Sequence, residues 1–205
     1  MLGFWYTLTD ILFPPPENVR LVRDVTRKKF GQRYQPIKLG KNLYALAHYD
    51  EALVRAAITA NKFQHYTHAA KLLAGLFEQY LTELGGSEPI WLVPIPLSEK
   101  RKKERGYNQV EVILKQIRLE NLKIEEMLKR NRDTVPQTSL KRGERLKNVV
   151  GAFSVRSHLP TPPPGTRVII VDDVTTTGAT LMAARAALAP HLPHPTKLTC
   201  VALAH

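Results

Sequence analysis

The chain has 205 residues, of which 43% are hydrophobic, and its 30 Lys and Arg against 18 Asp and Glu give a formal net charge of +12. This length and apolar content suit one packed domain of a soluble protein, and no apolar run approaches the roughly 20 residues of a membrane-spanning helix. The single cysteine, Cys200, excludes an internal disulfide and a cysteine-ligated zinc site, so we expect a cytoplasmic protein, and the positive charge indicates an anionic partner.

The N-terminal third is basic. Its first stretch, MLGFWYTLTDILFPPP, lacks the basic start and the cleavage site of a signal peptide, so we expect it to belong to the mature chain. Further basic groups follow at 100–105 (KRKKER) and 141–147 (KRGERLK). Such runs are often only solvated surface, but the last two flank motif-like residues.

Hydrophobic periodicity predicts alternating helices and strands. A helix is expected over about 68–84, ending at Gly85 and Gly86, and a buried strand begins at Ile90. A second helix is expected over 108–119, with a further helical turn or two over 124–128. The remaining expected elements are a strand near 149–155, a Pro-rich connection at 159–165, a strand at 166–173, a helix over 180–188 and a last strand from 197. Alternation of helices with continuously apolar strands predicts an α/β fold, a parallel sheet flanked by helices on both faces.

The stretch VIIVDDVTTTGAT, residues 168–180, places two carboxylates, Asp172 and Asp173, at the end of an apolar strand that leads into a helix. This edge is where open α/β sheets bind ligands. A phosphate-binding loop is expected to follow, built from Thr175, Thr176, Thr177, Gly178 and Thr180. Carboxylates suit ribose hydroxyls and the loop suits a 5′-phosphate, so the pattern predicts a sugar phosphate as ligand; the alternative is a Thr-rich helix cap after an acidic strand end.

These residues resemble the phosphoribosyl-pyrophosphate motif of the type I phosphoribosyltransferases. Two further stretches, LVPIPLSEKRKKERGYNQVEVI (92–113) and RNRDTVPQTSLKRGERLKNVVGAFSV (130–155), are similar to signatures of the ComF family of competence-associated phosphoribosyltransferase-like proteins. YDEALVRAAITANKF (49–63) resembles the family's first helix and the segment leading to a lysine, here Lys62. The resemblance covers nearly the whole chain from Leu43 and implies a type I phosphoribosyltransferase-like domain over 43–205.

Residues 1–42 then form a basic N-terminal appendage. ComF proteins usually begin with a small cysteine-ligated zinc module after an LFP segment, and ILFPPPENVRLVRDV keeps that entry without any cysteine. The pairs His65 with His68 and His191 with His194 have no evident further ligands, so we expect no zinc. The resemblance implies that the basic segment is a remnant of this module.

The implied chemistry is phosphoribosyl transfer, in which pyrophosphate leaves C1 of the ribose through an oxocarbenium-like transition state. By the resemblance, Asp172 and Asp173 hold the ribose hydroxyls and Mg²⁺, one of them through water, while the Thr/Gly loop holds the 5′-phosphate. Lys100, Arg101 and Arg105 are expected to meet the pyrophosphate, and Arg145 is expected to close over the site from a lid.

Two other functions stay open. The family's competence members act on single-stranded DNA, and an appendage containing Arg20, Arg23, Arg27, Lys28 and Lys29 would suit a polyanion. A non-catalytic sensor of phosphoribosyl pyrophosphate or nucleotides would use the same residues as an enzyme. Neither the acceptor nor a homodimer is decided by the sequence.

Overall fold

A six-stranded sheet, in the order β1-β2-β8-β7-β3-β4, carries the fold in this computed structural model, which describes residues 14–131 and 151–205. Its strands are β1 (Ile37–Gly40), β2 (Leu43–Ala45), β3 (Ile90–Pro94), β4 (Leu122–Ile124), β7 (Arg167–Val174) and β8 (Lys197–Ala204). The β1–β2 pair is antiparallel, and the pairs β2–β8, β8–β7, β7–β3 and β3–β4 are parallel. The predicted α/β class, a mostly parallel sheet flanked by helices, is confirmed.

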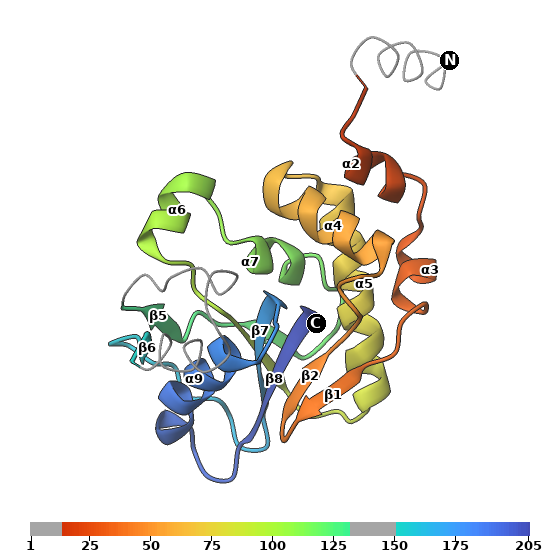
Figure 1. Ribbon diagram of the computed structural model, residues 1–205. Helices are drawn as coiled ribbons and strands as arrows, with labels where there is room; N and C mark the ends of the chain where they lie inside the picture. Colours follow the sequence, from red (N-terminus) through yellow and green to blue (C-terminus); the bar gives the residue numbers. More distant parts are fainter. Residues whose placement is uncertain (1–13, 132–150) are drawn as a thin grey trace.

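Helices cover both faces of the sheet (Figure 1). One face carries α9 (Ala179–Leu188), and the other carries α4 (Ala52–Phe63), α5 (Thr67–Leu84) and α7 (Gln109–Leu114). Strand β7 supplies both cores, because successive side chains of a strand point to opposite faces. Val168 and Ile170 pack with α9, whereas Ile169 and Val171 pack with α4, α5 and α7.

The N-terminal helices α2 (Glu17–Val22) and α3 (Arg27–Gly31) pack outside α4 and α5 (Figure 1). Two glycines allow α3 to approach α5 closely: a Cβ on Gly31 would lie 2.6 Å from the Gly75 carbonyl oxygen, and one on Gly75 would lie 2.5 Å from Cγ of Arg27. Residues 37–40 form the edge strand β1. The division of the chain at 42/43 stays a prediction, but the first part shares a core and a sheet with the rest.

Most of the predicted elements are confirmed, and the exceptions have local causes. The helix expected over 124–128 is wrong: residues 122–124 form β4 beside β3, and Leu128–Arg130 forms β5, which pairs antiparallel with β6 (Phe153–Val155). Tertiary pairing overrides the weak local preference of this short run. The helix expected over 108–119 is shorter, ending at Leu114.

The helix α6 (Glu99–Arg105) was not expected from periodicity, because it buries none of its residues. Its start is set by Ser98, whose side chain accepts a hydrogen bond from the backbone N–H of Arg101, and its end by Gly106 in the left-handed region, with φ 75°. A short 3₁₀ turn, Ala189–His191, follows α9. No helix in the described part of the chain has the length and apolar character needed to cross a bilayer.

Candidate functional site

The two aspartates lie at the carboxyl end of β7, as the sequence predicts. Asp172 pairs in register with Ala202 of β8, and Pro94 at the end of β3 pairs with Val171. Three parallel strands therefore end together, below α6, α7 and α4 in Figure 1. This edge brings the β7–α9 loop next to the start of α7.

The loop after β7 is braced by its own threonines. The backbone N–H of Gly178 donates to Oγ1 of Thr175 at 2.9 Å, and the N–H of Ala179 is 3.4 Å from Oγ1 of Thr177. The N–H of Thr175 donates to the carbonyl of Ala204 at 2.9 Å, which ties the loop to β8. Thr175 is buried, Thr176 is exposed, and Thr177 is intermediate. The hydroxyls of Thr175 and Thr177 thus shape the loop that was predicted to hold a phosphate.

Gly178 is the N-cap of α9 and has φ 75°, a conformation that side chains rarely adopt. A Cβ at this position would also lie 2.4 Å from Cδ2 of Leu43. The first turn of the ten-residue helix α9 contains no acidic residue, and the positive end of its dipole faces the loop. A loop of this kind suits an anion.

Asp173 is buried and held from the side of α4 and α7. Its Oδ2 accepts a hydrogen bond from Nε2 of Gln109 at 2.9 Å and lies 3.4 Å from Nζ of Lys62. Its Oδ1 accepts from the backbone N–H of Val174 at 2.8 Å. Burial alone would raise the pKa of Asp173, but the Lys62 ammonium, the Gln109 amide and the backbone N–H together hold that pKa below its ordinary value. Asp173 is therefore a charged carboxylate with its partners already in place.

Asp172 is in a different environment, because strand alternation directs it toward the other face of the sheet. Its Oδ1 accepts from the backbone N–H of Asp173 at 2.9 Å. Burial, and next the negative charge of Asp173, raise the pKa of Asp172 to about 7. A carboxyl held near neutrality in this way gains from a cation or from hydrogen-bond donors supplied by a ligand.

Arg105 extends this polar network. Its Nη1 donates to Oε1 of Gln109 at 3.1 Å, so Arg105, Gln109 and Asp173 form a chain of hydrogen bonds. Lys62 and Arg105 also flank the exposed ring of Phe63, at 5.8 and 5.7 Å from its centroid. Lys100 and Arg101 lie on α6 with Arg105; Lys100 is exposed and Arg101 intermediate.

The remaining predicted residues lie elsewhere. Arg145 falls within 132–150, outside the described residues. The basic residues of the appendage lie on or beside α2 and α3, away from the aspartates (Figure 1): Arg20, Arg23, Arg27, Lys28 and Lys29. Arg27 pairs with both carboxylate oxygens of Glu78 and donates to the carbonyl of Gln116 at 2.7 Å, so it joins α3 to α5 and to the end of α7.

Sequence reasoning missed Gln109 and gave Lys62 no role. The one available signal for Gln109 was a polar side chain at the start of an apolar helix, GYNQVEVI, directly after the basic run. Nothing in the sequence spacing pairs residues 62 and 173. Only the packing of α4 beside β7 brings them together.

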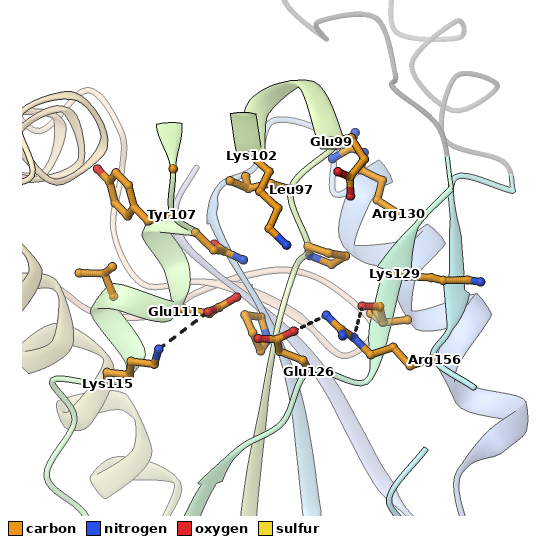
Figure 2. Close-up of a pocket in the computed structure, with 16 residues that line it drawn as sticks. Leu97, Glu99, Lys102, Tyr107, Glu111, Lys115, Glu126, Lys129, Arg130 and Arg156 are labelled. Atoms are coloured by element: carbon orange, nitrogen blue, oxygen red, sulfur yellow. Dashed lines mark hydrogen bonds and ion pairs between the residues drawn. The ribbon is translucent and has the colours of Figure 1, made fainter. Parts of the chain in front are cut away.

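A cavity of about 370 Å³ opens next to α6, between α7 and the β5–β6 pair (Figure 2). Figure 2 shows the Lys102 ammonium and the Glu111 carboxylate pointing into it, with Glu126 paired to Arg156. Burial, and next the charge of Glu126, raise the pKa of Glu111. Lys115, Lys129 and Arg130 add further positive charge to the lining.

The described residues contain no group of three or more His, Cys, Asp or Glu side chains that converge as a metal site. Mg²⁺, however, is usually held by only one or two carboxylates together with water and substrate phosphates. Asp172 fits such a role, since burial and next the negative charge of Asp173 raise its pKa, and a bound cation would offset both effects. Asp173 already has Lys62.

No protein-family model matches the chain. Competence protein F of Haemophilus influenzae is 32% identical over 142 residues, which are 66% of this chain and 61% of that protein. Competence protein ComFC of Streptococcus pneumoniae is 33% identical over 111 residues, 54% of this chain and 47% of that protein.

This chain is a homologue of the ComF competence proteins. The resemblance found in its motifs is thereby confirmed, although the chain spans less than two thirds of the length of either relative. A hypoxanthine phosphoribosyltransferase from Staphylococcus aureus superposes with a TM-score of 0.36 and 17% identity, over 63% of this chain and 57% of that structure. That score is too low to show a shared fold.

Proposed function

We propose that this ComF homologue binds phosphoribosyl pyrophosphate with Mg²⁺ at the carboxyl end of β7 and transfers the phosphoribosyl group to an acceptor. The observation that carries the proposal is that a carboxyl group, a short loop and a helix N-terminus follow one another between β7 and α9. The Asp172 carboxyl, which accepts a hydrogen bond from the backbone N–H of Asp173, is followed by a threonine-braced loop and by the N-terminus of α9, where Gly178 has φ 75°. The pairing suits a ribose with a 5′-phosphate.

Each part has a role in the proposed reaction. The loop and the positive end of the α9 dipole hold the 5′-phosphate, and Asp172 accepts from a ribose hydroxyl or holds the cation. Bound Mg²⁺ supplies positive charge to the departing pyrophosphate. Arg105, at the end of α6, adds a cation on that side, and Gln109 links it to Asp173.

The transfer requires no covalent nucleophile from the protein. The bond between C1 and the pyrophosphate oxygen breaks, and a bond from C1 to the acceptor atom forms. The protein contributes positioning, electrostatic stabilisation and exclusion of water. The cavity beside α6, with Lys102 and Glu111 facing inward, offers a polar acceptor a place next to the pyrophosphate side.

Thermal unfolding tests ligand binding. Phosphoribosyl pyrophosphate with Mg²⁺ is expected to raise the midpoint, and ribose 5-phosphate to raise it less; at a hundredfold excess over the dissociation constant, linkage gives about 2.7 kcal/mol. An unchanged midpoint at millimolar ligand would contradict the proposal. Release of labelled pyrophosphate in the presence of a panel of bases and amines then separates an enzyme from a sensor that only binds.

A competence role is the second candidate. Both relatives carry competence in their names, and the chain has a net charge of +12. We propose that single-stranded DNA is the polyanion that this positive charge would bind in a competence role.

A further inference from the structure

A second cavity, of about 340 Å³, lies at the opposite end of the sheet, where β7 and β8 begin. Asp172 is five residue steps along β7 from Arg167, a distance of about 17 Å in an extended strand. We propose that this cavity binds a phosphate monoester of the size of a mononucleotide. The proposal does not rest on the function proposed above, because it uses none of the same residues.

All charged residues that line the cavity are positive. Three cations face the cavity, Arg167, Arg185 and Lys197, and none of its lining residues is acidic. The Glu88 carboxylate, which is outside the lining, pairs with Arg167 and lies 3.6 Å from Nζ of Lys197. That one carboxylate is shared by two cations, and it leaves the third, Arg185, without a described ion pair.

Two of these cations have buried nitrogen atoms that lack an acceptor. Nε of Arg167 and Nε of Arg185 are both buried and have no hydrogen-bond partner among the described residues. Buried donors are normally satisfied, so these two guanidinium groups have unused hydrogen-bonding capacity among the described residues. A phosphate carries several acceptor oxygens and matches the fork of a guanidinium.

The rest of the cavity provides neutral donors and an apolar floor. Burial raises the pKa of Tyr80 to about 12, so its hydroxyl stays protonated and can donate to an anion. Tyr44 stands beside it, with ring centroids 6.3 Å apart, and Leu84 and Leu198 supply apolar surface. Ligand cavities start at about 300 Å³, so the volume admits a phosphate together with a sugar or a ring.

Calorimetric titration with AMP, ribose 5-phosphate and inorganic phosphate tests the site. We expect AMP to bind, and Arg185→Gln to weaken it at least tenfold. Lys71→Gln is the matched control, because Lys71 is an exposed cation of α5 outside the cavity, and it should change the affinity less than twofold. Arg185→Lys should fall between wild type and Arg185→Gln, because it keeps the charge without the fork.

The same variants also distinguish this site from the one at the end of β7. Arg185→Gln should leave the midpoint shift by phosphoribosyl pyrophosphate unchanged. If Arg185→Gln fails to fold, Tyr80→Phe removes one donor and should weaken AMP severalfold. Absence of AMP binding at millimolar concentration would overturn the proposal, and so would an Arg185→Gln variant that binds like Lys71→Gln.

Discussion

Asp172 and Asp173 are adjacent in sequence but differ in charge state. Asp173 contacts Lys62 and Gln109, whereas burial and the charge of Asp173 raise the pKa of Asp172. The folded pKa of Asp172, about 7, is above its ordinary value, so its contribution to stability is full below about pH 4 and is lost as the pH rises through 7. Asp173, whose pKa is lowered, stays ionised throughout pH 5–8 and changes nothing there.

The apo protein should therefore lose stability from Asp172 between about pH 4 and pH 7, by at most about 4 kcal/mol and by less to the extent that solvent screens the charge. Asp172→Asn should flatten this dependence. Denaturant unfolding of both proteins across the pH range measures it. Parallel pH profiles for the two would show that Asp172 is ionised normally.

Lys62 is expected to hold Asp173 in its charged form. Lys62→Met should lower the free energy of unfolding by about 1–3 kcal/mol, because it leaves a buried carboxylate with fewer partners. In an Asp173→Asn background the same change should cost much less, which a double-mutant cycle measures. Equal costs in both backgrounds would show that the ion pair contributes nothing.

At the scale of elements, the turn from β7 into α9 depends on Gly178 for two separate reasons, its positive φ and its contact with Leu43. Gly165 is a matched control, with φ 80° and nothing within 4 Å of an added Cβ. Gly165→Ala should cost about 1 kcal/mol from the backbone alone. Gly178→Ala should cost more in thermal unfolding, and Leu43→Ala should recover part of the difference. Equal costs at the two glycines would remove the steric argument.

The sequence predicted the elements whose apolar pattern is strong, such as α5 and β7, because burial of one face or of a whole strand leaves a periodic signal. It failed for α6, which buries nothing, and for β4 and β5, which are three residues each and depend on pairing with distant strands. At the site, Asp172 and Gly178 could be predicted from the short stretch 168–180 alone. The Lys62–Asp173–Gln109–Arg105 network could not, since it joins four elements that only the tertiary fold brings together.

At the scale of the whole molecule, the positive charge of the appendage lies on α2 and α3, apart from the end of β7 (Figure 1). Arg20, Arg23, Lys28 and Lys29 can be replaced together by glutamine, while Arg27 is retained because its pairing with Glu78 anchors α3. If single-stranded DNA binds there, log affinity should fall against log salt with a slope of about −0.7 per phosphate, roughly −3 to −4 for four to six contacts.

The four substitutions should weaken DNA binding and flatten this slope, while the midpoint shift by phosphoribosyl pyrophosphate persists. Fluorescence anisotropy at several salt concentrations gives the DNA affinity and its salt slope, and thermal unfolding gives the midpoint shift. Loss of both activities together would mean that the appendage and the β7 edge form one surface.

Binding of phosphoribosyl pyrophosphate at the β7 edge is tested most directly by calorimetric titration of wild type, Asp172→Asn and the double variant Asp172→Asn, Asp173→Asn, each with and without Mg²⁺. We expect Mg²⁺-dependent binding to wild type, at least tenfold weaker binding to Asp172→Asn, and none to the double variant, with each apo protein still folded. Asp172→Asn removes a charge that burial disfavours, and the amide oxygen introduced by Asp173→Asn can still accept from Gln109, so the variants should stay folded although Lys62 loses its ionic partner. Wild type that shows no binding at millimolar ligand, or folded variants that bind as tightly as wild type, would contradict a sugar-phosphate site at this edge.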